Sequence, residues 1–221
     1  MTLRSQICDN PCRAPSEGLG SAPMRWVSLL LLLTGIVIPE ITALFLTDYS
    51  PMTHYISELG QSGYATANPI NFGAFLPTGL LCFALLFGAK NLLPSGRMLR
   101  GGLLICASVG VGYIIAALFP CLPGCPVPGM GRQAIHNMGG LIEYAGGALG
   151  LGIVTLALYR ANAQIRARRT LLALALFTTG IVLLSTPSLI AHKGVFQRLA
   201  DYSFFIWLVS IYWVPRHNRA T

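Results

Sequence analysis

The chain has 221 residues, of which 54% are hydrophobic and 10% are charged, and its mean hydropathy is +0.64. An average soluble domain has roughly 25% charged residues, so this composition excludes a disordered chain, a disulfide-stapled secreted miniprotein and almost any soluble fold. An integral membrane protein remains. The net charge of +8 does not indicate a nucleic-acid partner, because most Lys and Arg residues flank apolar segments, as membrane topology requires.

Six apolar stretches are each long enough to cross a bilayer as a helix, which takes about 17 to 25 residues. They cover residues 26–46, 70–89, 102–119, 137–159, 170–190 and 199–214. Helices satisfy their own backbone polar groups in lipid, and no segment alternates like a barrel strand. The sequence therefore predicts an all-α fold, a polytopic transmembrane bundle of six helices.

The predicted transmembrane domain comprises residues 24–215. Residues 1–23 are rich in turn-forming residues and develop no apolar period, so we expect a disordered cytoplasmic N-terminal segment. Residues 216–221 are expected to form a short cytoplasmic tail. A cleaved signal peptide, with residues 27–38 as its apolar core, is the alternative for the N-terminus.

Basic residues lie mostly on one side of the predicted bundle. Twelve flank the same ends of the six helices: Arg4, Arg13, Arg25, Lys90, Arg97, Arg100, Arg160, Arg166, Arg168, Arg169, Arg216 and Arg219. The other side has three: Arg132, Lys193 and Arg198. Because Lys and Arg concentrate in cytoplasmic loops, this asymmetry predicts a multi-pass protein of the inner membrane with both termini in the cytoplasm.

Three of the four histidines fall on the predicted outer side of the membrane. His54 follows the first helix, His136 begins the fourth and His192 ends the fifth, and Glu58 and Asp201 lie on the same side. Histidine and carboxylate side chains that come from separate helix ends are what a catalytic or metal site requires. All five residues are therefore candidate site residues.

The loop after the first helix contains a predicted short helix over residues 51–59, which a Ser-Pro pair begins and a glycine ends. On that helix His54, Ser57 and Glu58 would share one face. They have the chemistry of a base, a hydroxyl nucleophile and an acid, but helical neighbours rarely reach the geometry that such a set needs. The favoured interpretation is that Ser57 and Glu58 cap and bond neighbouring loops.

Two carboxyl groups are expected deep in the membrane, where an ionised carboxylate costs about 2.5–3.5 kcal/mol or more unless it is paired or protonated. Glu40 follows Pro39, which should kink the first helix and free a backbone carbonyl. Glu143 shares a helical face with His136. It is a functional candidate by default, although an interhelical hydrogen bond, to Tyr113 or Ser108, is the favoured alternative.

Two residue pairs within the predicted helices each have two interpretations. Gly146 and Gly150 form a GxxxG pair, for which close packing within the chain is favoured over a dimer contact. Arg198 and Asp201, at i and i+3, are most simply an ion pair at the membrane interface. A lipid headgroup site at Arg198 is the alternative.

Cys121 and Cys125 lie in the predicted outer loop between the third and fourth helices. An oxidising compartment would permit a disulfide between them. A metal pair is the less favoured interpretation, because two cysteines alone do not form a site.

Several motifs in and around the outer loops occur in a fixed order: residues 48–60 with His-x-x-Ser-Glu-Leu-Gly, then Asn68, Asn71, Phe119-Pro120, His136-Asn137, Gly194, Gln197-Arg198 and Trp207. Over about residues 25–215 the sequence resembles the bacterial and archaeal membrane proteins grouped as domain of unknown function 998. Cys121 departs from the pattern, which would have an acidic residue there. A looser similarity, in the Ile-Ser element after the first helix, is to the Frag, DRAM and Sfk six-helix proteins, some of them associated with lipid remodelling. These resemblances imply the fold and no activity.

The leading functional prediction is a polar site at the outer leaflet that binds a lipid headgroup or another amphiphile, with membrane lipids as partners. Its candidate ligand-binding residues are His54, Glu58, His136, Glu143, His192 and Arg198. The candidate catalytic residues are His54, Ser57, Glu58 and Asp201. The sequence does not specify the oligomeric state.

Three other functions are expected less. One is a zinc-dependent hydrolase of a lipid amide or ester, as in the CREST superfamily, with His54, His136, His192 and Asp201 as candidate metal ligands. Another is a transporter, in which Glu40 and Glu143 would line one path. The last is a structural subunit of a membrane complex.

Overall fold

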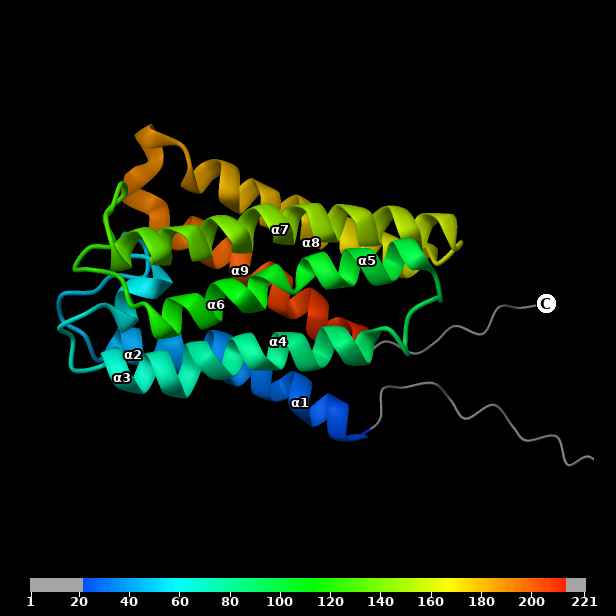
Figure 1. Ribbon diagram of the computed structural model, residues 1–221, viewed down its shortest axis with the longest axis horizontal. Helices are drawn as coiled ribbons and strands as arrows, with labels where there is room; N and C mark the ends of the chain where they lie inside the picture. Colours follow the sequence, from blue (N-terminus) through cyan, green and yellow to red (C-terminus); the bar gives the residue numbers. More distant parts are fainter. Residues whose placement is uncertain (1–21, 214–221) are drawn as a thin grey trace, which may run out of the picture.

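The computed structural model describes residues 22–213, and its regular elements there are all helical. Its helices form six rods, which lie side by side with the two ends of the described chain at the same end of the bundle (Figure 1). The predicted six-helix all-α bundle is confirmed. Residues 1–21 of the predicted N-terminal segment, and the predicted tail at 216–221, lie outside the described residues.

Several rods are built from more than one element. The first rod is α1 (Ala22–Leu32), a π-helical turn (Leu33–Val37) and α2 (Ile38–Leu44), and the second is α3 (Ala67–Ile70), a π-helical turn (Asn71–Phe75) and α4 (Leu76–Ala89). The third is α5 (Arg97–Cys106) and α6 (Ser108–Leu118). The others are α7 (Arg132–Arg160), α8 (Gln164–Leu184) and α9 (Lys193–Trp213). Short 3-10 helices, η2 (Ile56–Gly60) and η4 (Pro187–His192), lie in the connections.

Within residues 22–213, five rods are long and apolar enough to cross a membrane: residues 22–44, 67–89, 97–118, 132–160 and 164–184. The sixth, α9, has a comparable length but is less apolar, because Gln197, Arg198 and Asp201 lie in its first turns. More than half of its residues are buried within the bundle. The chain is therefore a multi-span membrane protein whose last helix is the most enclosed.

Each π-helical turn ends two residues before a proline. The turn Leu33–Val37 precedes Pro39, and the turn Asn71–Phe75 precedes Pro77. Proline has no N–H to donate and its ring clashes with the carbonyl of residue i−4, so the preceding turn widens. The sequence predicted a kink at Pro39, and the structure has a π-helical turn there; Pro77 follows the same feature in the second rod.

The helices extend beyond the predicted apolar stretches at their polar ends, and one ends early. The rods α7, α8 and α9 begin five or six residues before the predicted spans at 137, 170 and 199, because polar residues at the membrane surface continue the helix once an apolar segment has begun it. The fifth predicted span ran to residue 190, but α8 ends at Leu184. Pro187 explains the early end, since the residues before a proline avoid helical geometry.

Neighbouring rods close into a ring. The helix α9 packs against α8 and α1, α1 packs against α4, α4 against α6, and α7 against α5, α6 and α8. Aromatic side chains fill the centre, with Phe75, Tyr113 and Phe205 in edge contacts and Phe204 between Phe177 and Trp207. This arrangement leaves the lipid-facing surface to exposed Leu, Ile, Val and Phe side chains.

Glycines bring the third rod and α7 into close contact. A Cβ atom at Gly146 would lie 2.2 Å from Ser108 Oγ, and one at Gly150 would lie 2.6 Å from Cys106 Sγ. Side chains larger than hydrogen would therefore push the two rods apart. The GxxxG pair serves packing within the chain, as the sequence favoured.

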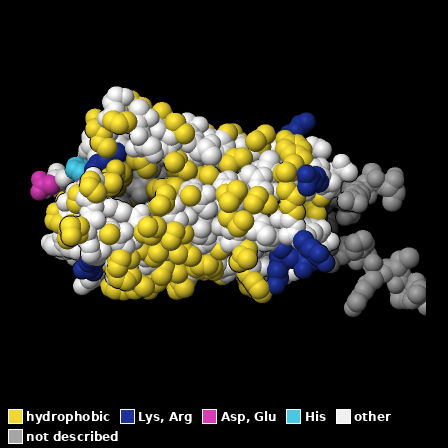
Figure 2. Space-filling view, turned by 45° about the horizontal axis from the view of Figure 1, so that its top comes forward, with side chains coloured by type: hydrophobic (Ala, Val, Ile, Leu, Met, Phe, Trp, Pro, Cys, Tyr) yellow, Lys and Arg dark blue, Asp and Glu magenta, His cyan; other side chains and the backbone are white. Residues whose placement is uncertain are grey.

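The two ends of the bundle differ in charge. The end with residues 22 and 213, here called the basic end, has the described cations Arg25, Lys90, Arg97, Arg100, Arg160, Arg166, Arg168 and Arg169. The opposite end, here called the loop end, consists of residues 45–66, 119–131 and 185–192 with the helix turns beside them. Figure 2 shows groups of Lys and Arg beside the chain ends, smaller ones at the loop end together with acidic and His side chains, and hydrophobic side chains over much of the face between.

The first turn of α9 is packed tightly against the loop after α2. A Cβ atom at Gly194 would lie 2.3 Å from the carbonyl oxygens of both Pro51 and His54. We therefore expect Gly194→Ala to lower the free energy of unfolding by about 1–3 kcal/mol, the usual cost of overpacking. The measurement is equilibrium unfolding in micelles, with Gly101→Ala as the control, since a Cβ there meets nothing within 4 Å. Equal stability of the two variants would contradict this packing.

Candidate functional site

The predicted helix over residues 51–59 is wrong. The chain makes turns at residues 51–54 and then the 3-10 helix η2 from Ile56. Side chains compete for the backbone groups that a helix would need. The His54 ring accepts the Ser50 N–H at 2.9 Å, and the Glu58 carboxylate accepts the Tyr55 N–H at 2.9 Å. His54, Ser57 and Glu58 consequently serve separate turns and do not form the predicted common face.

Glu58 is engaged in local structure. It is 3% exposed, and its carboxylate lies 2.8 Å from the Lys193 ammonium group, which also stands over the Tyr55 ring at 4.1 Å. Burial, helped by the nearby Glu58 charge, raises the pKa of Tyr55. Ser57 points instead to Cys125, with Oγ 3.4 Å from Sγ. These contacts fit the capping role of Ser57 and Glu58 better than a catalytic one.

The predicted ion pair between Arg198 and Asp201 is wrong. Arg198 Nε donates to Glu40 Oε1 at 2.7 Å, and Tyr202 donates its hydroxyl proton to the same oxygen. Arg198 Nη1 donates to the carbonyl of Pro51 at 2.9 Å. The guanidinium extends from the first turns of α9 toward the loop end, where these acceptors lie, whereas Asp201 is about one turn deeper and faces the interior.

Tyr49 completes the set of acceptors around Arg198. Its hydroxyl accepts from Nη2 at 2.8 Å and donates to the carbonyl of Tyr55 at 3.0 Å. Burial raises the pKa of Tyr49 to about 12, so it remains a donor at neutral pH. Arg198 is 9% exposed, and all three nitrogen atoms of its guanidinium group donate to the protein, so it links α9, α2 and the loop.

Two buried carboxyl groups lie in this half of the bundle, Glu143 on α7 and Asp201 on α9. Glu143 is 6% exposed and Asp201 is 1% exposed, and both residues line the same pocket. Tyr113 donates to Asp201 Oδ2 at 2.9 Å, so its expected bond to Glu143 is replaced by one to Asp201.

One oxygen of each carboxyl group, Glu143 Oε1 and Asp201 Oδ1, has no hydrogen-bond partner among the described residues, and the same holds for the hydroxyl of Tyr144. Ser108, the other expected partner of Glu143, also has an unpaired oxygen. A buried acceptor without a partner is costly. A ligand that brings hydrogen-bond donors to this point would satisfy these oxygens.

A pocket of about 170 Å³ lies directly against these carboxyl groups. Helices α6, α7 and α9 and the loop end all contribute to it, and its lining is mostly apolar. The polar lining residues are Tyr55, Ser57, Tyr113, His136, Asn137, Glu143, Tyr144, Gln197 and Asp201. Tyr55, Asn137, Tyr144 and Gln197 line the pocket but were not among the predicted site residues. The spacing of the last three on α7 and α9 does place each within one turn of a candidate.

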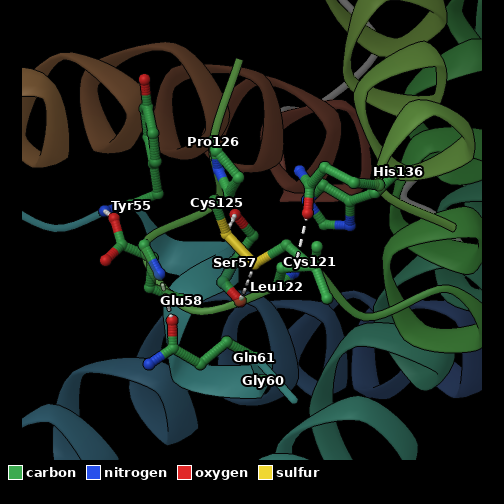
Figure 3. The surroundings of a disulfide bond; sticks show 12 residues. Tyr55, Ser57, Glu58, Gly60, Gln61, Cys121, Leu122, Cys125, Pro126 and His136 are labelled. Carbon is green, nitrogen blue, oxygen red and sulfur yellow. Dashed lines mark hydrogen bonds between the residues drawn. A yellow bond between two sulfur atoms is a disulfide. The ribbon is translucent and has the colours of Figure 1, made fainter. Parts of the chain in front are cut away.

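A disulfide joins Cys121 and Cys125 at the edge of the pocket (Figure 3). His136 lies beside it, with Nδ1 2.9 Å from the carbonyl oxygen of Phe119. Gln61 accepts the Gly124 N–H at 2.8 Å and the Ser62 N–H bonds to the Cys121 carbonyl, so the disulfide loop is fixed to the loop after α2.

The predicted zinc ligands do not assemble in the structure. His54 bonds within its own turn, His136 faces the disulfide, and His192 is exposed at the end of η4 near the Phe196 ring. Among the described residues, the group of three close enough to hold a metal is Cys121, Cys125 and His136. In the disulfide both sulfur atoms are bonded to each other and offer no thiolate. The residues present therefore do not fit a zinc site of three histidines.

The two deep carboxylates expected for a transporter lie in separate settings. Glu143 lines the pocket, and Glu40 does not. Glu40 is instead bound by Arg198 and Tyr202. The described residues therefore give no single path that both glutamates line.

The membrane-spanning helices make the chain a multi-pass membrane protein, with an acidic pocket at one end of its bundle. The chain belongs to the family described as protein of unknown function (DUF998), whose model matches residues 27–214. No curated protein and no solved structure matches the sequence significantly. The resemblance inferred from the loop motifs is thus confirmed.

Proposed function

We propose that the protein binds the head group of an amphiphile in the pocket against Glu143 and Asp201. The observation that carries the proposal is the pair of buried carboxyl groups whose free oxygens have no partner in the described residues. Such oxygens demand hydrogen-bond donors. A ligand that brings donors to this point would remove the cost of leaving them unpaired.

The lining favours an ammonium-bearing head group. Tyr55, Phe75, Tyr113 and Tyr144 surround the same space as the carboxyl groups, and aromatic faces attract organic cations. A cavity of about 150 Å³ holds a molecule the size of benzene, so this pocket accommodates a head of a few non-hydrogen atoms. Leu184 and Val127 at its edge offer apolar contact to the first part of a tail.

The membrane side follows from the charges of the two ends. With the basic end in the cytoplasm, as the positive-inside rule requires, the pocket faces the outer leaflet of the inner membrane. The disulfide between Cys121 and Cys125 supports this orientation, because disulfides persist in oxidising compartments. The ligand would then enter from the outer leaflet.

The test compares dodecylamine with dodecanol, which has the same chain and no charge, by calorimetric titration of the purified protein in maltoside micelles. We expect dodecylamine to bind at least tenfold more tightly, a difference of about 1.4 kcal/mol. Glu143→Gln should remove this preference, because it removes the acidic group and keeps an amide that can donate to Asp201.

The matched control is Asp48→Asn, which removes a carboxylate that is exposed on the loop end and does not line the pocket. It should keep the preference for dodecylamine. Equal binding of dodecylamine and dodecanol by the unmodified protein, or an unchanged preference in Glu143→Gln, would overturn the proposal.

A further inference from the structure

A second, larger hollow lies near the basic end, on the lipid-facing side between α4 and α5. Its volume is about 620 Å³, within the range of small-molecule sites. Residues from both helices line it: Phe83, Ala84, Leu86, Phe87, Lys90, Arg100, Leu103, Leu104 and Ala107. It is separate from the acidic pocket and shares no residue with it.

The groove has a structural cause in the third rod. That rod is interrupted at Ala107, between α5 and α6. On the loop-end side of Ala107, α6 packs against both α4 and α7. On the basic-end side, α5 packs closely against α7 and only loosely against α4 (Figure 1). The two helices therefore separate toward the basic end and leave a groove open to lipid.

The groove is apolar along its length and cationic at its end. Leu86 and Leu103 form its floor at 4% exposure each, and Phe87 and Leu104 form exposed sides. Lys90 and Arg100 are both exposed at the basic end, and the Lys90 ammonium group stands 3.4 Å from the centre of the Phe87 ring. An apolar groove with two cations at one end is suited to a lipid whose acyl chain lies in the groove and whose anionic head group contacts the cations.

The described part of the basic end contains no acid that could neutralise these cations. Every described Asp or Glu lies in the half of the bundle toward the loop end: Glu40, Asp48, Glu58, Glu143 and Asp201. Other basic-end cations contact neutral groups, with Arg25 over the Trp213 ring and Arg160 donating to the sulfur of Met98. Lys90 and Arg100 therefore have no acidic partner within the described chain.

We propose that the groove between α4 and α5 binds one anionic phospholipid of the leaflet at the basic end. One acyl chain lies against Leu86, Leu103 and Leu104, and the phosphate lies between Lys90 and Arg100. Anionic lipids are attracted to basic residues next to a membrane helix, and the apolar groove fixes one lipid where a surface patch would attract many. The site is independent of the acidic pocket.

The test is native mass spectrometry of the purified full chain with phosphatidylglycerol and phosphatidylcholine of identical acyl chains. We expect one phosphatidylglycerol to bind at least tenfold more tightly than phosphatidylcholine. Lys90→Gln with Arg100→Gln should abolish that preference. The matched control, Arg168→Gln with Arg169→Gln, removes the same charge from the same end outside the groove and should keep it.

A third variant, Ala84→Phe, separates shape from charge. Ala84 is exposed in the groove, so phenylalanine fills the space without disturbing the core, and all cations remain. It should also lose the bound phosphatidylglycerol. Equal loss in the two double variants would mean diffuse attraction only, and a dimer that Ala84→Phe dissociates would mean that a second copy occupies the groove. Either outcome overturns the proposal.

Discussion

Replacing Arg198 by methionine is expected to lower the free energy of unfolding by about 1–3 kcal/mol, the cost of leaving hydrogen-bond acceptors without their donor, since Arg198 is largely buried and Glu40 is 35% exposed. Methionine keeps much of the length of the side chain and removes every donor. Glu40 would lose its cationic partner, and the carbonyls of Pro51 and Gly194 would lose theirs. The measurement is equilibrium unfolding in mixed micelles, followed by circular dichroism.

The control for this variant is Arg132→Met, which removes an exposed arginine from the same end of the bundle. It should change the free energy of unfolding by less than about 0.5 kcal/mol, as surface substitutions usually do. A double-mutant cycle with Glu40→Gln should give a coupling energy of about 0.5–3 kcal/mol. If Arg198→Met is as stable as the control, Arg198 is not the tie that the contacts indicate, and a ligand role for it regains weight.

The fold was predictable because a membrane imposes one strong rule on the sequence. Within the hydrocarbon region each span must be long, apolar and helical, so six apolar stretches sufficed to predict six helices. Their ends were less predictable, since polar surface residues continue a helix and Pro187 ends one early. The π-helical turns before Pro39 and Pro77 follow from local chemistry that a sequence displays.

The arrangement of the site was harder to predict, because the deciding partners are distant in sequence. Arg198 and Asp201 have the spacing of an ion pair, but Glu40, 158 positions away, lies closer to the guanidinium. Residues 51–59 have the start and end signals of a helix, but the side chains of His54 and Glu58 take the backbone N–H groups. Spacing along one helix indicates which pairs are allowed, and only tertiary packing selects among them.

Glu143 illustrates how the cost of burying a carboxyl group in a membrane can mark a candidate functional residue in a sequence. A carboxyl group deep in a membrane is a functional candidate from sequence alone, and its presence at the acidic pocket was foreseen in that sense. Its partner was not, because Asp201 belongs to α9, which the sequence connects to Glu143 by no motif. Two isolated acidic positions became one pair only when α7 and α9 were placed in the same ring.

Replacing the acidic pair together with its hydrogen-bond donor is expected to change both the stability of the protein and its binding of dodecylamine. We expect the triple variant Glu143→Leu, Asp201→Val and Tyr113→Phe to raise the free energy of unfolding by about 1–4 kcal/mol, because replacing a buried polar set by apolar side chains of similar size is often stabilising. Changing all three residues removes the donor of Tyr113 together with its acceptor. The same variant should lose the preference for dodecylamine over dodecanol.

The single variant Tyr113→Phe is the comparison for this result. It leaves Asp201 without its hydroxyl donor, so it should be less stable than the unmodified protein by about 1–3 kcal/mol. A residue set whose removal stabilises a protein and abolishes binding has been kept for binding, since functional sites retain groups that stability alone would discard. A triple variant less stable than the unmodified protein would instead identify the carboxyl pair as a structural link between α7 and α9, and the proposed ligand site would lose its main support.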